Sequence, residues 1–367
     1  MRNVFLWLHR WLGLTAALAI AFLGLSGAAL IYAPEIDARL NPQLLRVTPK
    51  EKPAKFGSIL AATRRQFPNR QISFLFAAKT PDAAHEIWLD KGKTRVYVDP
   101  YSGQILGARA ENQSFFIWLS RAHTHLLAGE VGEQILGWIG LILTSLALSG
   151  LILWWPGAKS AWKRAWKRAF KPQLKTNCKG RVYELHRAGG FWLCVLLLNS
   201  GLTGAALVWP ATATRIVAVF GFSDAKKVKA GSGKLRDIDE LVAIANRAFP
   251  DGQITRLTFP AKSGAPFIVR KKLGGELHPN GQNNIALDGA TGRVLQITDS
   301  RQSKGGERLM NLRYPLHIGR WGGDLSRIIA VLGGLATAFL ALSGVYLWFN
   351  GFRRRRARQQ STQTGTI

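Results

Sequence analysis

The chain has 367 residues, of which 47% are hydrophobic and only two are cysteine. This length and composition exclude a disordered acidic segment, a disulfide-stabilised scaffold and a very small domain. A net charge of +29 would by itself favour a nucleic-acid binder, because Lys and Arg gain affinity by neutralising phosphates. A soluble basic protein does not carry long uncharged apolar runs, so the positions of the charges decide the class.

Four long stretches, at 11–34, 135–157, 188–214 and 328–352, contain no charged residue and no histidine. Each is long enough to cross a bilayer, since about 20 apolar residues cover its hydrocarbon core. We predict transmembrane helices over residues 4–34, 134–156, 185–210 and 326–350. A cleaved signal peptide is the alternative for the first stretch. That stretch is longer than the roughly 7–15 apolar residues of a signal peptide, and a near copy of it recurs in mid-chain.

Basic residues are concentrated in the linker 157–184 and in the tail 351–367, and together with Arg2 and Arg10 they hold more than half of the net charge. By the positive-inside rule these segments are cytoplasmic. The sequence therefore predicts a multi-pass membrane protein, with both termini in the cytoplasm and two outer domains over residues 35–133 and 211–325.

Within the linker, Trp162, Trp166 and Phe170 are spaced four residues apart between Lys-Arg pairs. This pattern is typical of a helix lying on an anionic lipid surface. The lipid bilayer then accounts for the basic charge, and no nucleic-acid partner is expected.

Each outer domain is predicted to be α+β, with one helix followed by three strands. The first domain has its helix at 57–67 and strands at 71–77, 86–89 and 95–98, and the second has its helix at 235–249 and strands at 254–259, 266–271 and 284–287.

The chain is an internal duplication. Leu8-His-Arg10 recurs as Leu185-His-Arg187, and in both copies a Gly follows the His by 18 residues, as Gly27 and Gly204. The sequence thus predicts an α-helical membrane protein with α+β extracytoplasmic domains. Its four-helix transmembrane bundle is built from two parallel repeats, each consisting of a helix, an outer domain and a second helix.

Four histidines occupy equivalent positions in the two repeats. His9 and His186 lie at the inner ends of the first and third helices, whereas His123 and His317 precede the second and fourth helices on the outer side. A single His at a membrane edge is commonly just an interfacial side chain. Two symmetric pairs instead favour bis-His ligation of two haem irons. A zinc site fits less well, because there is no His-Glu-x-x-His motif and no paired cysteine.

The chain has no Cys-x-x-Cys-His motif, so the haems would be non-covalent, of b type. Gly27 lies on the same helix face as His9 but about 27 Å away. Gly27 and Gly204 are therefore candidates for clearing space beside a haem. Close helix packing by small residues explains them equally well.

The motifs Leu8-His-Arg-Trp-Leu-Gly13, Leu316-His-Ile-Gly-Arg-Trp-Gly-Gly323 and Ser149-Gly-x3-Trp-Trp-Pro156 resemble those of the PepSY-associated transmembrane proteins, and the outer domains resemble PepSY domains. The resemblance covers residues 3–352. It implies a relation to inner-membrane ferric-siderophore reductases that bind two haems b, with His9, His186, His123 and His317 as axial ligands.

The resemblance leads us to expect transmembrane electron transfer. An unidentified cytoplasmic or membrane donor would supply electrons, and a ferric siderophore on the outer side would be reduced and release iron(II). The alternatives are a membrane-anchored PepSY module that regulates a periplasmic protease or other partner, and an iron-chelate transporter. His125 remains an alternative ligand to His123. His85 and His278, in the outer domains, are expected at the surface.

Overall fold

The computed structural model describes residues 1–156, 161–175, 177–221 and 228–364, with side chains as far as Gly351. It divides into two compact units. The helical unit comprises Met1–Ile31, Arg121–Thr212 and Leu316–Ile367, and the sheet unit comprises Tyr32–Ser120 and Ala213–Pro315. Parts of the predicted linker, second outer domain and tail, at 157–160, 176, 222–227 and 365–367, lie outside the described residues.

Three helices of the helical unit are long and apolar enough to cross a membrane: α1 (Arg2–Ile31), α6 (Gly129–Trp154) and α13 (Gly323–Thr364). In α13 the candidate span is Gly323–Gly351. A fourth span is possible if α8 (Cys178–Trp192) and α9 (Cys194–Val208) act together, since they meet at a bend of 64°. The predicted straight helix over 185–210 is therefore broken. The break follows the pair Gly189-Gly190, a sequence at which helices commonly kink.

Two glycine contacts bring the long helices together. A Cβ atom added at Gly24 of α1 would lie 2.5 Å from the carbonyl oxygen of Gly334 on α13. A Cβ atom at Gly140 of α6 would lie 2.8 Å from the carbonyl oxygen of Gly201 on α9. Only glycine permits backbones to approach this closely. Gly201 follows Gly24 by the same number of residues as His186 follows His9. Gly334 likewise follows Gly140 by the same number as His317 follows His123.

The aromatic linker segment forms α7 (Trp162–Phe170). Trp166 packs edge-on against both Trp154 and Phe191, whose rings are stacked 3.9 Å apart. Phe170, in contrast, is 62% exposed. Trp166 therefore packs against aromatic rings of α6 and α8, while Phe170 at the end of α7 stays exposed.

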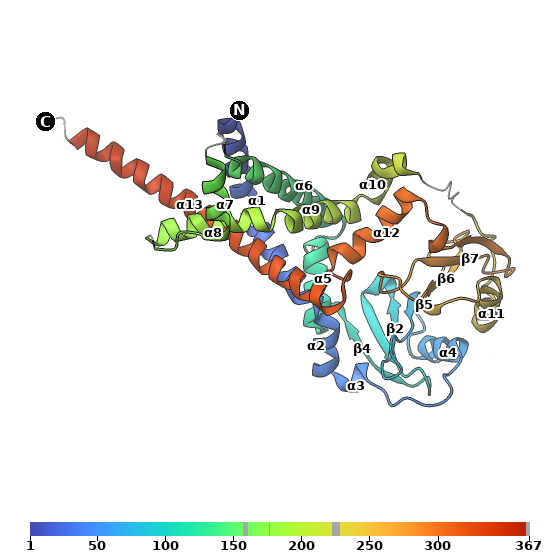
Figure 1. Ribbon diagram of the computed structural model, residues 1–367. Helices are drawn as coiled ribbons and strands as arrows, with labels where there is room; N and C mark the ends of the chain where they lie inside the picture. The colour runs from blue at the N-terminus through green and yellow to red at the C-terminus, as the bar shows by residue number, and fades with distance from the viewer. Residues whose placement is uncertain (157–160, 176, 222–227, 365–367) are drawn as a thin grey trace. The chain divides into compact units, whose positions relative to one another are not determined.

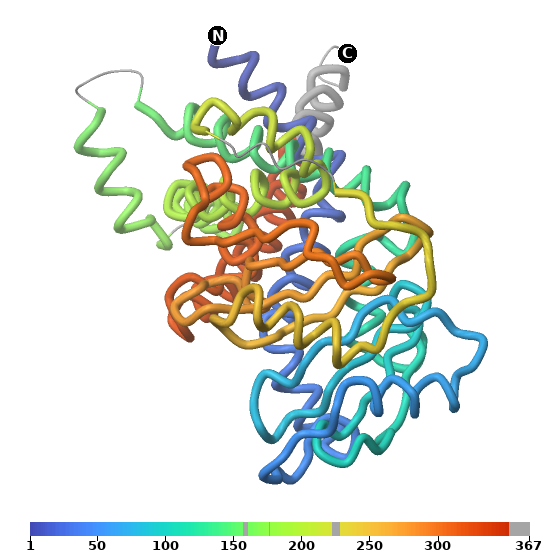
Figure 2. The backbone as a smooth tube through the Cα atoms, turned by 90° about the vertical axis from the view of Figure 1, so that its right-hand side faces the viewer, coloured from blue at the N-terminus to red at the C-terminus, as the bar shows by residue number. Residues whose placement is uncertain are grey.

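The sheet unit is built on one antiparallel sheet of eight strands, in the order β4-β3-β2-β1-β5-β6-β7-β8. Figure 2 shows the strands of the first repeat, in blue to cyan, beside those of the second, in orange. The strands are β1 (Ile72–Phe76), β2 (His85–Leu89), β3 (Thr94–Val98), β4 (Ile105–Ala110), β5 (Gln253–Thr258), β6 (Phe267–Lys272), β7 (Asn283–Leu287) and β8 (Val294–Thr298).

Each repeat thus contributes four strands, and the prediction of three strands per domain missed β4 and β8. Both are edge strands with mostly half-exposed side chains, and β4 is interrupted by Gly107 beside Ala108. Neither therefore shows the alternation of apolar and polar residues that marks a half-buried strand.

Two helices, α4 (Phe56–Gln66) and α11 (Ile238–Ala248), cover one face of the sheet (Figure 1). Strand residues such as Leu75, Ile87 and Leu257 are fully buried against them. Because side chains alternate along a strand, the residues between these project from the opposite face, here called the open face. The remaining helices are α2 (Ala33–Leu40), α3 (Pro42–Leu45), α5 (Phe115–His125), α10 (Pro210–Val217), α12 (Gly305–His317) and the 3₁₀ turns Asp90–Gly92, Glu111–Gln113, Ala218–Phe220 and Ser300–Gln302.

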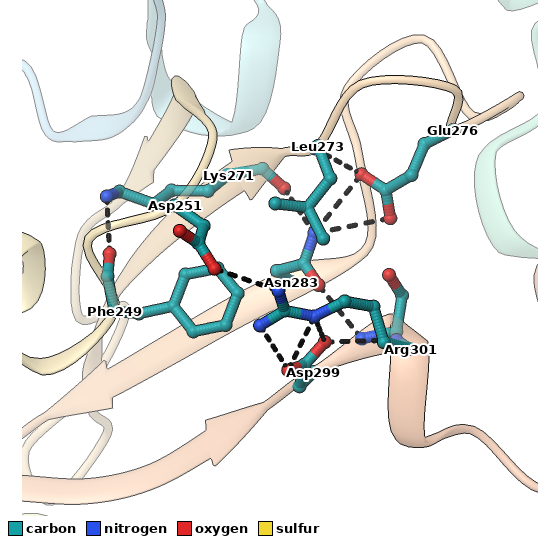
Figure 3. A network of polar contacts seen from close by, with 9 residues as sticks. Phe249, Asp251, Lys271, Leu273, Glu276, Asn283, Asp299 and Arg301 are labelled. Carbon is teal, nitrogen blue, oxygen red and sulfur yellow. Dashed lines mark hydrogen bonds and ion pairs between the residues drawn. The ribbon is translucent and has the colours of Figure 1, made fainter.

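A polar network orders the loops at one end of the second-repeat strands (Figure 3). The ammonium of Lys271, only 1% exposed, donates to the carbonyl oxygen of Phe249 at 2.6 Å. Asn283 donates to the Glu276 carboxylate, which also accepts from the backbone N–H of Leu273. Buried polar groups are costly unless they are paired in this way.

The expectation that His85 and His278 lie at the surface is wrong for His85, which is 7% exposed. The ring of His85 stacks on Phe56, and its Nδ1 accepts a hydrogen bond from the backbone N–H of Ala78 at 2.9 Å. His278 is half-buried and packs against Tyr314, with ring centres 5.1 Å apart.

Candidate functional site

Four histidines of the helical unit share one local arrangement. In each case a Ser or Thr on another helix lies within hydrogen-bond distance of the imidazole Nδ1, and the glycine that follows it faces the imidazole Cε1. The four sets are His9 with Ser149-Gly150, His186 with Ser343-Gly344, His123 with Ser26-Gly27 and His317 with Thr203-Gly204. These four histidines are the repeated ones that the sequence isolates.

The first pair consists of His9 on α1 and His186 on α8, with ring centres 6.4 Å apart and ring planes perpendicular. Nδ1 of His9 lies 2.9 Å from the hydroxyl of Ser149 on α6, and Nδ1 of His186 lies 2.7 Å from the hydroxyl of Ser343 on α13. Four different helices therefore orient this pair of rings.

The second pair consists of His123 at the end of α5 and His317 at the end of α12. Nδ1 of His123 lies 2.8 Å from the hydroxyl of Ser26, and Nδ1 of His317 lies 2.9 Å from the hydroxyl of Thr203. An imidazolium at His317 would be near enough to lower the pKa of His123 further, so the two side chains lie near each other.

A sharp turn after each helix places this second pair. Leu126, Leu127 and Gly129 have positive φ angles between α5 and α6, and Gly319 and Gly323 have positive φ angles between α12 and α13. The backbone therefore turns between α5 and α6 and again between α12 and α13. His123 consequently lies beside the end of α1 instead of on a continuous extension of α6.

His125 does not share this arrangement. Its Nδ1 lies 2.7 Å from the hydroxyl of its neighbour Thr124, on the exposed side of α5. Because His123 has the contacts with Ser26 and Gly27 and His125 has neither, the geometry favours His123 as the ligand.

The hydroxyl groups determine which nitrogen of each ring is free. Ser149 donates to the carbonyl oxygen of Ser145 at 2.7 Å, and Ser26 donates to that of Phe22 at the same distance. Since the hydroxyl proton is used in this bond, the hydroxyl oxygen accepts from the imidazole, and Nδ1 carries the hydrogen. Nε2 then keeps its lone pair, which is the form that binds a metal. Thr203 and Ser343 donate to helix carbonyl groups in the same way.

These positions fit a metal held between two imidazoles. Two metal–nitrogen bonds of about 2 Å, plus about 1 Å from each nitrogen to its ring centre, separate two ligating rings by about 6 Å. The observed 6.4 Å between His9 and His186 agrees with this value. Among the described residues no group of three or more His, Cys, Asp or Glu side chains is placed to hold a metal ion.

Burial keeps the second pair neutral at physiological pH. It lowers the pKa of His123 to about 4, with a smaller contribution from the charge of His317, and it also lowers the pKa of His317. Neutral imidazole is the state that ligates a metal.

The glycines leave room for these rings. A Cβ atom at Gly27 would lie 3.1 Å from Cε1 of His123, and one at Gly204 would lie 3.4 Å from Cε1 of His317. Each is a tight contact with a histidine of the second pair. The histidines of the first pair precede these glycines in the chain, His9 on α1 itself and His186 on α8, the helix before α9. The sequence pointed to Gly27 and Gly204 but not to the Ser or Thr before each of them. A signal was present, because Leu-[Ser/Thr]-Gly occurs on four helices, ending at Gly27, Gly150, Gly204 and Gly344.

Comparison with known families gives one match that covers nearly the whole chain. The model of the family described as the PepSY-associated TM region matches residues 6–350. No sequence among the curated proteins matches the chain.

Proposed function

This chain belongs to the PepSY-associated transmembrane family, and we propose that it is an inner-membrane oxidoreductase that holds two b-type haems. On this proposal it passes electrons from an inner donor to a ferric siderophore on the periplasmic side, where iron(II) is released.

The observation that supports the proposal is the fourfold contact between a His and a Ser/Thr-Gly pair. His9 and His186 would hold one haem, and His123 and His317 would hold the other. On α1, His9 belongs to the first pair and Gly27 faces His123 of the second pair, and the two positions are about 27 Å apart along the helix. The two sites would therefore lie near opposite faces of a bilayer.

The two-repeat organisation is part of the same proposal. The equivalent glycine contacts, the equivalent histidines and the equivalent turns before α6 and α13 support two parallel repeats that pack as a four-helix bundle. In this arrangement the basic linker and tail lie in the cytoplasm with both termini.

Each side chain has a separate task. The imidazole Nε2 atoms ligate, the Ser and Thr hydroxyls hold Nδ1–H and so fix the ring orientation, and the glycines leave space beside the rings. Apolar residues of α1, α6, α9 and α13 exclude water from the path between the two sites. When bound, the haems supply the one-electron redox chemistry.

The direct test is an optical spectrum of the purified protein. We expect a red protein with two haems per chain by pyridine haemochrome assay and a Soret band that shifts when dithionite is added. Colourless protein from haem-sufficient cells would overturn the proposal and leave the PepSY binding-module alternative.

Reduction is separated from transport in reconstituted vesicles loaded with an electron donor. We expect His186→Ala to abolish reduction of an external ferric siderophore, while no intact chelate enters the vesicles of either protein. Uptake of the intact chelate by both proteins would instead indicate a transporter.

A further inference from the structure

The open face of the sheet carries a cluster of arginines in the second repeat. Arg256 on β5 and Arg270 on β6 are direct cross-strand partners. Arg313, on α12, and the ring of His278 complete the cluster. Burial lowers the pKa of His278 to about 3, with further lowering by the charges of all three arginines and of Lys79. Like charges placed directly opposite each other destabilise a sheet.

Among the described residues, no acid forms an ion pair with the three arginines. The Arg256 side chain has no hydrogen bond there, and its buried Nε is unpaired. Arg270 donates from Nε to the carbonyl oxygen of Gly281, and Arg313 donates from one terminal nitrogen to that of Met310. The charge of Glu276 reaches Arg270, but the hydrogen bonds of its carboxylate go to Asn283 and Leu273 (Figure 3).

The fold does not require these charges. In the first repeat, Phe74 and Trp88 pair across β1 and β2 as Arg256 and Arg270 pair across β5 and β6. Phe74 is therefore the counterpart of Arg256, and Trp88 that of Arg270. The offset that relates His317 to His123 likewise relates Arg313 to Leu119. The same architecture is thus built with two aromatic residues and a leucine in one repeat and with three arginines in the other.

Aromatic rings border the cluster on the side of the first repeat. The guanidinium carbon of Arg256 lies 5.4 Å from the ring centre of Phe74 and 5.8 Å from that of Phe76, and Phe76 packs against Trp88 with ring centres 4.9 Å apart. The rings support the planar guanidinium from one side and leave its donors for a ligand.

We propose that Arg256, Arg270 and Arg313 form a binding site for an anionic, oxygen-rich ferric chelate of the carboxylate class. Guanidinium groups donate bidentate hydrogen bonds to carboxylates, and an anionic ligand would relieve the repulsion between the three arginines. This inference rests on the proposed function and narrows its substrate to chelates of negative charge.

The test is calorimetric titration of the full-length protein in detergent with ferric citrate as the probe. Arg256→Gln and Arg313→Leu are expected to weaken binding by about tenfold or more, because each removes charge-assisted hydrogen bonds. Arg236→Gln is the matched control, since Arg236 is exposed and pairs with Glu240 on the other side of the sheet, and binding should stay within about twofold.

Three parallel titrations sharpen the result. A ferric trihydroxamate of positive charge and inorganic phosphate should each bind more weakly than ferric citrate, and added NaCl should weaken ferric citrate binding. Equal affinity in wild type and both arginine variants, or phosphate binding as tight as that of the chelate, would overturn the site. The Soret spectrum of each variant is recorded alongside. A variant with unchanged haem that no longer binds the chelate supports the chelate site. Colourless protein that still binds the chelate would overturn the reductase proposal and leave the chelate site standing.

Discussion

Nδ1 of His9 lies 2.9 Å from the hydroxyl of Ser149, which in turn donates its proton to the backbone of its own helix. The hydrogen bond therefore fixes both the tautomer and the plane of the imidazole. A ligand oriented in this way is already set for its metal before the metal binds.

Ser149→Ala is the first test of this orienting role. The variant should retain haem but bind it about 10–100-fold more weakly at the site of His9 and His186, because the ring loses its orienting partner. Haem transfer to apomyoglobin measures the affinity, and a redox titration should show a changed midpoint potential for one of the two centres.

Ser145→Ala is the matched control. Ser145 lies on the same helix, and its hydroxyl donates to the carbonyl oxygen of Leu141 without reaching a histidine. If both alanine variants change haem affinity equally, the effect belongs to α6 in general and not to the hydrogen bond.

Replacement of one histidine should remove one haem and leave the other. His9→Ala is expected to lower the haem content from two to one per chain, because the two sites use different side chains. His123→Ala should remove the other haem, and the double variant should be colourless. His125→Ala should retain both haems, since His125 contacts Thr124 instead of Ser26 and Gly27. Loss of haem from His125→Ala with retention in His123→Ala would reverse the assignment.

Gly27→Leu tests the space beside His123. Even a Cβ atom would lie 3.1 Å from the imidazole, so the larger side chain should displace the ring and remove the haem of that site. Gly204→Leu should act in the same way on His317. In Gly190→Ala, by contrast, no heavy atom lies within 4 Å of the new Cβ, and haem content should not change. A normal spectrum in Gly27→Leu and Gly204→Leu would leave only helix packing as the role of these glycines.

The sheet unit should lose stability in acid through His85. Burial lowers the pKa of His85 from 6.5 to about 4, partly offset by the nearby charge of Asp99. Between these values the unfolded chain binds a proton that the folded chain does not, so the contribution is complete above pH 6.5 and is lost as the pH falls towards 4. The full loss is about 3 kcal/mol.

The thermal midpoint of the full-length protein at pH 7 and pH 4.5 measures this effect. His85→Gln keeps an acceptor for the N–H of Ala78 but does not titrate, so its midpoint should fall less between the two pH values than that of the wild type. An identical fall would assign the acid sensitivity to other groups.

The sequence predicts the apolar spans and the repeated histidines because each depends on residue type and spacing alone. It does not predict the break after Gly189-Gly190 or the packing of Trp166, since both depend on which helices meet. The reversal after His125 is equally hidden: two leucines at positive φ angles carry no local signal, yet they bring His123 to Ser26. The edge strands β4 and β8 are missed because their side chains are neither clearly buried nor clearly exposed.

The pairing of β1 with β5 makes the centre of the sheet nearly symmetric. Leu75 lies directly opposite Leu257, and Phe76 opposite Arg256 mirrors the pairing of Phe74 with Thr258. A twofold homodimer forms the same kind of self-complementary contact. Without β5, β1 would be an unpaired edge strand. Here one covalent chain supplies both sides of the contact, so the two sides are free to carry different residues, aromatic on one and arginine on the other.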